Sequence, residues 1–140
     1  IAFDFYDPAK HTEVSIKRAR KAYPLFPNTK QIATSKIPLE DNSVDKIFLI
    51  LSAHEIRTAI ERSLFFAELN RVLNDGGQII LTEHLRDIPN FIAYNIGVFH
   101  FHSKEAWLEN IHSAKLEIVK EFNITPFITT FILEKNGNTH

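Results

Sequence analysis

The sequence has no cysteine and no methionine, and only four of its 140 residues are glycine. Without cysteine there is no disulfide framework, so we expect a cytoplasmic location. No apolar run approaches the ~20 residues that a transmembrane helix requires, and no segment has the pattern of a signal peptide. The net charge of −1 gives no field that would attract nucleic acid or an anionic membrane. We therefore expect neither a nucleic-acid partner nor a membrane partner.

What the chain does contain is enough apolar material for one core. Hydrophobic residues make up 44% of the sequence, and twelve residues are phenylalanine. This content and the length of 140 residues are typical of a single globular domain.

Five consecutive apolar residues, Ile47–Leu51, predict a strand that is buried on both faces of a parallel sheet. A buried helix segment is the alternative, but Pro38 and the polar turn residues 40–43 precede the run and favour the strand. The polar residues Ser52, His54 and Glu55 follow it directly. Because ligands bind outside the carboxyl ends of strands in open α/β sheets, these side chains are expected at the mouth of a site.

The rest of the pattern predicts alternating strands and helices, and hence an α/β fold with a mostly parallel sheet flanked by helices. We expect residues 47–51 and 79–82 to form adjacent parallel strands. The last two strands should be antiparallel, because the turn at 125–126 is too short for a crossover connection. Further strands are expected over residues 1–6, 29–33, 116–124 and 127–134. Helices are expected over residues 12–23, 60–73 and 103–113, with a short helix within 88–97.

Three stretches of sequence together resemble the class I S-adenosylmethionine-dependent methyltransferases, in particular the type 11-like members. The first is IPLEDNSVDKIFLILSAHEI (residues 37–56), which is similar to the fourth-strand segment of that family. The second is LNRVLNDGGQIILTEH (residues 69–84), where a helix ends and feeds the fifth strand. The third is SKEAWLENIHSAKLEIV with FITTFILEKNG (residues 103–119 and 127–137), similar to the last helix and the two final strands.

The resemblance implies a Rossmann-like fold and S-adenosylmethionine as the cofactor. It also implies that the 140 residues are a single methyltransferase-like domain without the first strand and the glycine-rich loop of the family. The four glycines, Gly76, Gly77, Gly97 and Gly137, all lie far from that position. We expect the absent strand and loop to precede Ile1.

Cofactor-binding residues follow from the same resemblance. An acid at the end of the second strand can accept both ribose hydroxyls, because a carboxylate offers two acceptor oxygens. Asp4 fits that position best and Asp7 is second, although either could be only a turn or cap residue. Thr34 falls near the position of an adenine-contacting aspartate in many members. The methionine part of the cofactor is expected against Leu49, Ile50 and Leu51.

The acceptor side is expected to be roofed by residues 90–102, which are rich in aromatic side chains. Histidine titrates near neutral pH, so three histidines are candidates for a catalytic base. These are His54, His84 and His100. Four further residues are expected to contact substrate, namely Glu55, Tyr94, Phe99 and His102. The alternatives are helix capping for the residues near 54 and aromatic core packing for those near 100.

We expect no metal ion. The His54-Glu55 pair begins a zinc-protease-like pattern, but Thr58 stands where the second histidine is needed. His100 and His102 have strand spacing and could join His54 and His84 at a metal, yet no partner spacing supports such a site.

The expected function is therefore methyl transfer from S-adenosylmethionine to a small-molecule acceptor, with a homodimer as a possible assembly. The alternative is a non-catalytic domain that keeps the methyltransferase fold for binding or assembly. A nucleotide-dependent oxidoreductase is a third option, but the two closing strands and the lack of a glycine fingerprint argue against it.

Overall fold

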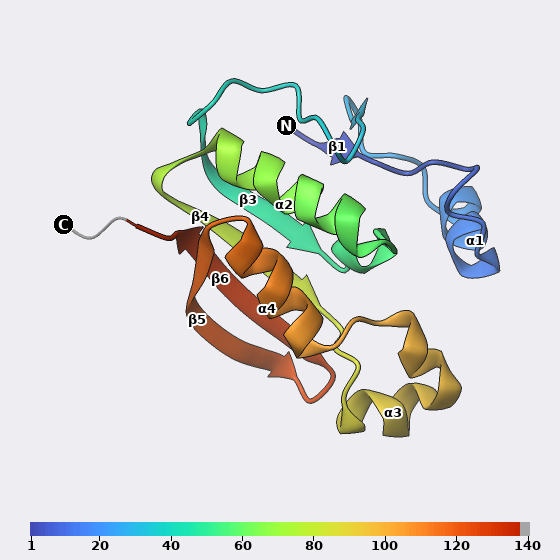
Figure 1. The fold of residues 1–140 in the computed structure, drawn as a ribbon. Helices are drawn as coiled ribbons and strands as arrows, with labels where there is room; N and C mark the ends of the chain where they lie inside the picture. The colour runs from blue at the N-terminus through green and yellow to red at the C-terminus, as the bar shows by residue number, and fades with distance from the viewer. Residues whose placement is uncertain (138–140) are drawn as a thin grey trace.

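The computed structural model of the chain describes residues 1–137 and has the predicted α/β fold, with its strands in two separate groups (Figure 1). The first group is a parallel pair made of β1 (Phe3–Asp4) and β2 (Lys30–Gln31). The second group has the order β3-β4-β6-β5. Its strands are β3 (Val44–Ile50), β4 (Leu73–Glu83), β5 (Leu116–Thr125) and β6 (Ile128–Lys135).

The pairing in the larger sheet confirms the expected arrangement of strands. β3 and β4 are parallel neighbours, with Ile47 beside Ile79 and Ile50 beside Thr82. β6 is antiparallel both to β4 and to β5. This antiparallel finish follows from the short turn between β5 and β6, which leaves no room for a crossover.

Helices α2 and α4 lie side by side across one face of this sheet, while α3 projects beyond its edge (Figure 1). Each of these three helices begins at a polar cap residue whose side chain accepts a backbone N–H of the first turn: Thr58 for α2, Asp87 for α3 and Ser103 for α4. The helices are α1 (Val14–Ala22), α2 (Ala59–Val72), α3 (Ile88–Tyr94) and α4 (Lys104–Ser113). Two short 3₁₀ segments complete them, η1 (Ala53–Glu55) and η2 (Asn95–His100).

The core lies between the sheet and the pair of helices α2 and α4. Phe66 of α2 and Trp107 of α4 are both fully buried, and their ring centroids are 6.0 Å apart. Burial of large apolar side chains such as these is the main favourable contribution to folding. The sheet contributes Ile79, Leu81, Leu116, Phe131 and Leu133, all of which are inaccessible to solvent.

The prediction that β3 is buried on both faces was wrong. Leu49 is buried under α2, but Phe48 is 64% exposed and Ile50 is 52% exposed. The reason is that α2 and α4 cover the other face of the sheet, and that β3 is an edge strand hydrogen-bonded only to β4. Successive side chains of a strand point to opposite faces, so Phe48 and Ile50 lie on the face opposite to the helices.

Within residues 1–137, no helix is both long enough and apolar enough to cross a lipid bilayer.

Two adjacent glycines shape an irregular turn within β4, where the register with β3 shifts. Gly76 has a φ of +75°, a left-handed conformation that side-chain-bearing residues rarely adopt. Gly77 has no room for a side chain, because an added Cβ would lie 3.1 Å from the carbonyl oxygen of Asp45 and 2.9 Å from Leu73 Cδ1. The turn is therefore pressed against the start of β3.

We predict that Gly77→Ala destabilises the fold by about 1–3 kcal/mol, because the backbone of β3 must shift to admit the methyl group. Urea unfolding should show a lower midpoint with an unchanged slope. Gly97→Ala is the matched control, since an added Cβ there meets only an ordinary contact at 3.6 Å. Equal midpoints for the two variants would contradict the packing seen at Gly77.

Candidate functional site

A cavity of about 980 Å³ runs along the unpaired edge of β3, between this strand and the β1–α1 segment. Its walls are mostly apolar, with polar side chains at Asp4, Arg20, Ser52 and Glu55. Ser52 and Glu55 follow the carboxyl end of β3, as expected for a ligand site in an open α/β sheet.

Asp4 lines this cavity in a fixed orientation. Its carboxylate accepts two hydrogen bonds from the guanidinium of Arg20, at 2.7 and 2.6 Å, and one from the backbone N–H of Tyr6 at 3.1 Å. Burial alone would raise the pKa of Asp4, but these hydrogen bonds and the Arg20 charge outweigh it and lower the pKa. Asp4 is thus held as an anion, and its Oδ2 retains an unused acceptor position.

Of the other residues expected at the cofactor, some line this cavity and some lie outside it. Leu49 and Leu51 line the cavity, whereas Ile50 faces solvent on the opposite side of β3. Asp7 lies outside the cavity, and its carboxylate accepts the backbone N–H of Ala9 at 2.9 Å. Thr34 also lies outside it, and its hydroxyl donates to Glu61 at 2.7 Å. The cofactor roles of these residues remain predictions.

The exits of β3 and β4 are joined by the fully buried carboxylate of Glu83. One oxygen accepts the backbone N–H groups of Ser52, Ala53 and His54, at 3.1, 2.7 and 3.3 Å. The other oxygen lies 2.6 Å from Nδ1 of His54. The parallel pairing of β3 and β4 brings these residues to one edge of the sheet, and Glu83 then fixes the η1 turn and the ring of His54.

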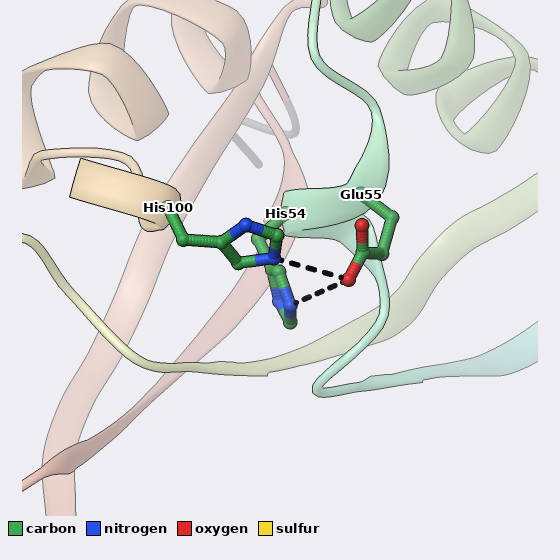
Figure 2. Close-up of side chains that lie close together, drawn as sticks. All are labelled: His54, Glu55 and His100. Carbon is green, nitrogen blue, oxygen red and sulfur yellow. Dashed lines mark hydrogen bonds and ion pairs between the residues drawn. The ribbon is translucent and has the colours of Figure 1, made fainter. Parts of the chain in front are cut away.

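A three-residue cluster made of His54, Glu55 and His100 lies beside this turn (Figure 2). Both histidines direct Nε2 at the same oxygen, Oε1 of Glu55, at 3.2 Å from His54 and 3.3 Å from His100. The two imidazole rings have their centroids 5.4 Å apart. We refer to these residues below as the His-Glu-His cluster.

The charges in the His-Glu-His cluster stabilise one another. Burial would lower the pKa of His54, but hydrogen bonds and charges from Glu55 and Glu83 raise the pKa to about 9. Burial would raise the pKa of Glu55, yet the two histidines lower the pKa to about 2. In this arrangement His54 keeps its proton at neutral pH, so it is poorly suited to accept one from a substrate.

His84 is in a different environment, under the aromatic side chains of the 90–102 segment. Its Nδ1 lies 2.8 Å from the carbonyl oxygen of Phe127, which can only accept, so Nδ1 donates. In the neutral ring Nε2 is then an acceptor, and it lies 3.5 Å from the hydroxyl of Tyr94. The ring of Phe101 stacks on His84 with centroids 4.9 Å apart.

Phe99 and His102 do not join these groups. The side chain of Phe99 is 68% exposed. His102 packs edge-on against Trp107, and its Nε2 lies 3.2 Å from the guanidinium of Arg62. Burial, together with the charges of Arg62 and Arg57, lowers the pKa of His102 to about 4. His102 is therefore a neutral residue packed against α2 and α4, and its substrate role remains a prediction.

The sequence reasoning missed Arg57 entirely, and it placed Glu83 at the rim and Phe101 in the aromatic roof without their contacts to His54. Arg57 donates to the carbonyl oxygen of His100 at 2.6 Å and lies against the His100 ring. A signal for Glu83 was present, since it occupies the end of a strand predicted to neighbour the one that precedes His54. No local pattern marks Arg57.

We predict that Glu83→Ala destabilises the fold by about 3–5 kcal/mol, because it leaves three backbone N–H groups and a charged histidine without their buried partner. Urea unfolding measures the loss, and hydrogen exchange should speed up at the amides of Ser52, Ala53 and His54. Glu117→Ala, an exposed position on β5, is the control and should stay within about 0.5 kcal/mol of the parent. Equal stability of both variants would show that the carboxylate does not hold this turn.

Comparison with solved structures identifies the fold. The chain superposes on a type 11 methyltransferase from Sulfolobus solfataricus with a TM-score of 0.65 and 17% identity, covering 99% of this chain and 71% of that one. A S-adenosylmethionine-dependent methyltransferase from Aquifex aeolicus gives 0.65 and 18%, covering 94% and 66%. A geranyl diphosphate C-methyltransferase from Streptomyces coelicolor gives 0.60 and 12%, covering 85% and 58%.

Sequence comparisons add the family. No curated protein matches the chain significantly. The family model described as "Methyltransferase domain" matches residues 7–81, which is more than half of the chain. This match includes β3, the η1 turn, α2 and most of β4, and so covers two of the three stretches that carried the resemblance. The chain belongs to the methyltransferase domain family, the class I S-adenosylmethionine-dependent methyltransferases.

Proposed function

We propose that this protein transfers a methyl group from S-adenosylmethionine to a small, largely apolar acceptor. The observation that carries this proposal is the contact between Tyr94 and Phe101 of the 90–102 segment and His84 at the exit of β4. We infer that an aromatic wall over the carboxyl end of a parallel strand would hold an acceptor and shield it in part from water.

The cofactor side of the proposal rests on Asp4. Methyl transfer from a sulfonium is an in-line displacement, in which the cofactor supplies the reactive group and the protein supplies position. A carboxylate that is already oriented by Arg20 loses little conformational freedom when it accepts a ribose hydroxyl. Leu49 and Leu51 would then lie along the methionine part of the cofactor, which agrees with their place in the cavity wall.

For the proton of the acceptor, we propose His84 as the base among the three candidates. Its Nδ1–H is bound to a carbonyl oxygen, so Nε2 is the nitrogen free to accept a proton. His54 is less suited because it is charged at neutral pH, with its pKa raised to about 9. His100 faces Glu55 rather than the Tyr94 side of the roof.

The composition of the roof supports an apolar or aromatic acceptor. Phe91 and Tyr94 are about half exposed on α3, at 51% and 44%, and Phe101 is buried behind them. The Streptomyces coelicolor neighbour was crystallised with geranyl diphosphate, an acceptor with a long apolar part, so this fold accommodates such molecules. The near-zero net charge does not favour a nucleic-acid acceptor.

The domain interpretation also stays a proposal. The family resemblance implies one more strand, followed by a glycine-rich loop. In space, this strand would lie in the sheet between β1 and β3. The unpaired edge of β3 and the adjoining cavity support this, because a strand placed there would unite the two groups of strands into one sheet. The glycine-rich loop at its end would contribute backbone N–H groups to the cofactor.

We predict that the full-length protein binds S-adenosylmethionine and that Asp4→Asn weakens this binding about tenfold or more, since a hydrogen bond to a charged group is lost. Titration calorimetry measures both affinities, and thermal unfolding checks that the variant is folded. Asp75→Asn, an exposed aspartate outside the cavity, is the control and should bind like the parent. Absence of binding by the full-length protein would favour the non-catalytic alternative.

A second prediction separates the acceptor side from the cofactor side. His84→Gln should reduce kcat/KM for methyl transfer about 100-fold or more, because proton transfer from the acceptor is impaired. Tyr94→Ala should reduce kcat/KM by a smaller factor, because only the packing of the acceptor is impaired. Cofactor affinity should stay near the parental value in both.

The acceptor for this assay is found by screening small aromatic and apolar compounds with the parent protein. Ile92→Ala is the control, since this side chain is 78% exposed on the same helix. If cofactor binding fell in step with turnover in the two variants, the 90–102 segment would belong to the cofactor pocket instead.

A further inference from the structure

We propose that the His-Glu-His cluster binds a divalent transition-metal ion such as Zn²⁺. The ligand atoms would be Nε2 of His54, the carboxylate of Glu55 and Nε2 of His100. The proposal does not depend on methyl transfer, because metal binding is measured without cofactor or acceptor.

The spacing of the three ligand atoms suits one ion. All of them lie within 4.8 Å of one another, and the two histidine nitrogens are 3.2 and 3.3 Å from Oε1 of Glu55. Tetrahedral bonds of about 2.0–2.1 Å place neighbouring ligand atoms roughly 3.3 Å apart. Figure 2 shows the three side chains converging from two segments that are far apart in sequence, η1 and the end of η2.

The second nitrogen of His54 is oriented as in protein zinc sites. A histidine that ligates a metal usually donates its other ring N–H to a carboxylate, which fixes the tautomer and the direction of the ring. Glu83 provides this carboxylate, 2.6 Å from Nδ1 of His54, and is itself held by three backbone N–H groups. Nε2 is thereby directed into the cluster.

Glu55 has an oxygen whose burial is otherwise unexplained. Its Oε2 is shielded from solvent, yet it has no hydrogen-bond partner among the residues that the structure describes. The nearest cation is the guanidinium of Arg57, 4.0 Å away. Buried acceptors are nearly always paired, so an unpaired one next to two convergent nitrogens points to a ligand that the three side chains share.

The position of the cluster leaves room for a further ligand. Glu55 belongs to the wall of the large cavity, so a water molecule or an oxygen of a bound molecule could complete the coordination from that side. Two histidines and one carboxylate with an open position are the ligand set of several catalytic zinc and iron sites.

Two groups oppose metal binding, namely the proton on Nε2 of His54, which an ion must displace, and the side chain of Arg57. Its Nη2 lies 3.0 Å from Nε2 of His100, the nitrogen that would ligate the ion, and its charge repels a cation. The side chain is 36% exposed, so it can turn toward solvent when an ion binds. Removing the charge of Arg57 should therefore strengthen metal binding. If the three side chains only formed hydrogen bonds with one another, this substitution would not create affinity for a metal ion.

The test uses the whole chain, freed of metal by dialysis against a chelator and titrated with Zn²⁺ in competition with a chromophoric chelator. The parent protein should bind one ion. His100→Gln and Glu55→Gln should each weaken binding at least tenfold, and Glu83→Gln should weaken it 10- to 100-fold through the orientation of His54. His112→Gln, an exposed histidine on α4, is the matched control and should bind like the parent.

Arg57→Gln keeps the test decisive if the buried positions do not tolerate substitution, because it is expected to fold and to raise the affinity for Zn²⁺ several-fold. Bound Co²⁺ should give the visible absorption of a four- or five-coordinate ion, and this absorption should be lost in His100→Gln. The proposal is overturned if neither the parent nor Arg57→Gln competes with the chelator. It is equally overturned if His112→Gln abolishes binding while His100→Gln and Glu55→Gln retain it.

Discussion

The buried carboxylate of Glu83 is the interaction on which the rest of the site depends. One of its oxygens accepts the backbone N–H groups of three consecutive residues, Ser52, Ala53 and His54. These are the N–H groups at the start of the η1 turn. The other oxygen sets the direction of the His54 ring. Because Glu83 belongs to β4 and the turn follows β3, the position of the turn is tied to the register of the two strands. A shift of that register would move the histidine as well.

From this fixed turn the site divides into two environments with different chemistry. On one side, His54, Glu55 and His100 share charges in a compact, partly buried cluster. On the other side, His84 is enclosed by Tyr94 and Phe101, and its partners are neutral. The ring of Phe101 lies between the two, with centroids 5.8 Å from His54 and 4.9 Å from His84. A single apolar ring thus separates a charged cluster from a histidine whose partners are uncharged.

The sequence was sufficient for the order of the elements and for the neighbouring positions of β3 and β4, since both follow from apolar runs and from glycine and polar turn signals. It could not provide the burial of β3, because the exposure of Phe48 and Ile50 depends on which strands and helices lie next to them. The contact between His100 and Glu55 could not be predicted from the sequence either. These residues are 45 positions apart, and only the way that α3 and η2 fold back brings them together. Likewise, the pairing of Asp4 with Arg20 follows from the placement of α1 beside β1, which no local pattern specifies.

The free edge of β3 has a consequence for the behaviour of the chain in solution. A row of unsatisfied backbone donors and acceptors, next to the exposed side chains of Phe48 and Ile50, is a template onto which any extended peptide can add. Self-association through this edge would grow with protein concentration and would be slowed by an inserted charge or proline. The same strand that positions the chemistry is therefore also prone to aggregation when its edge is uncovered.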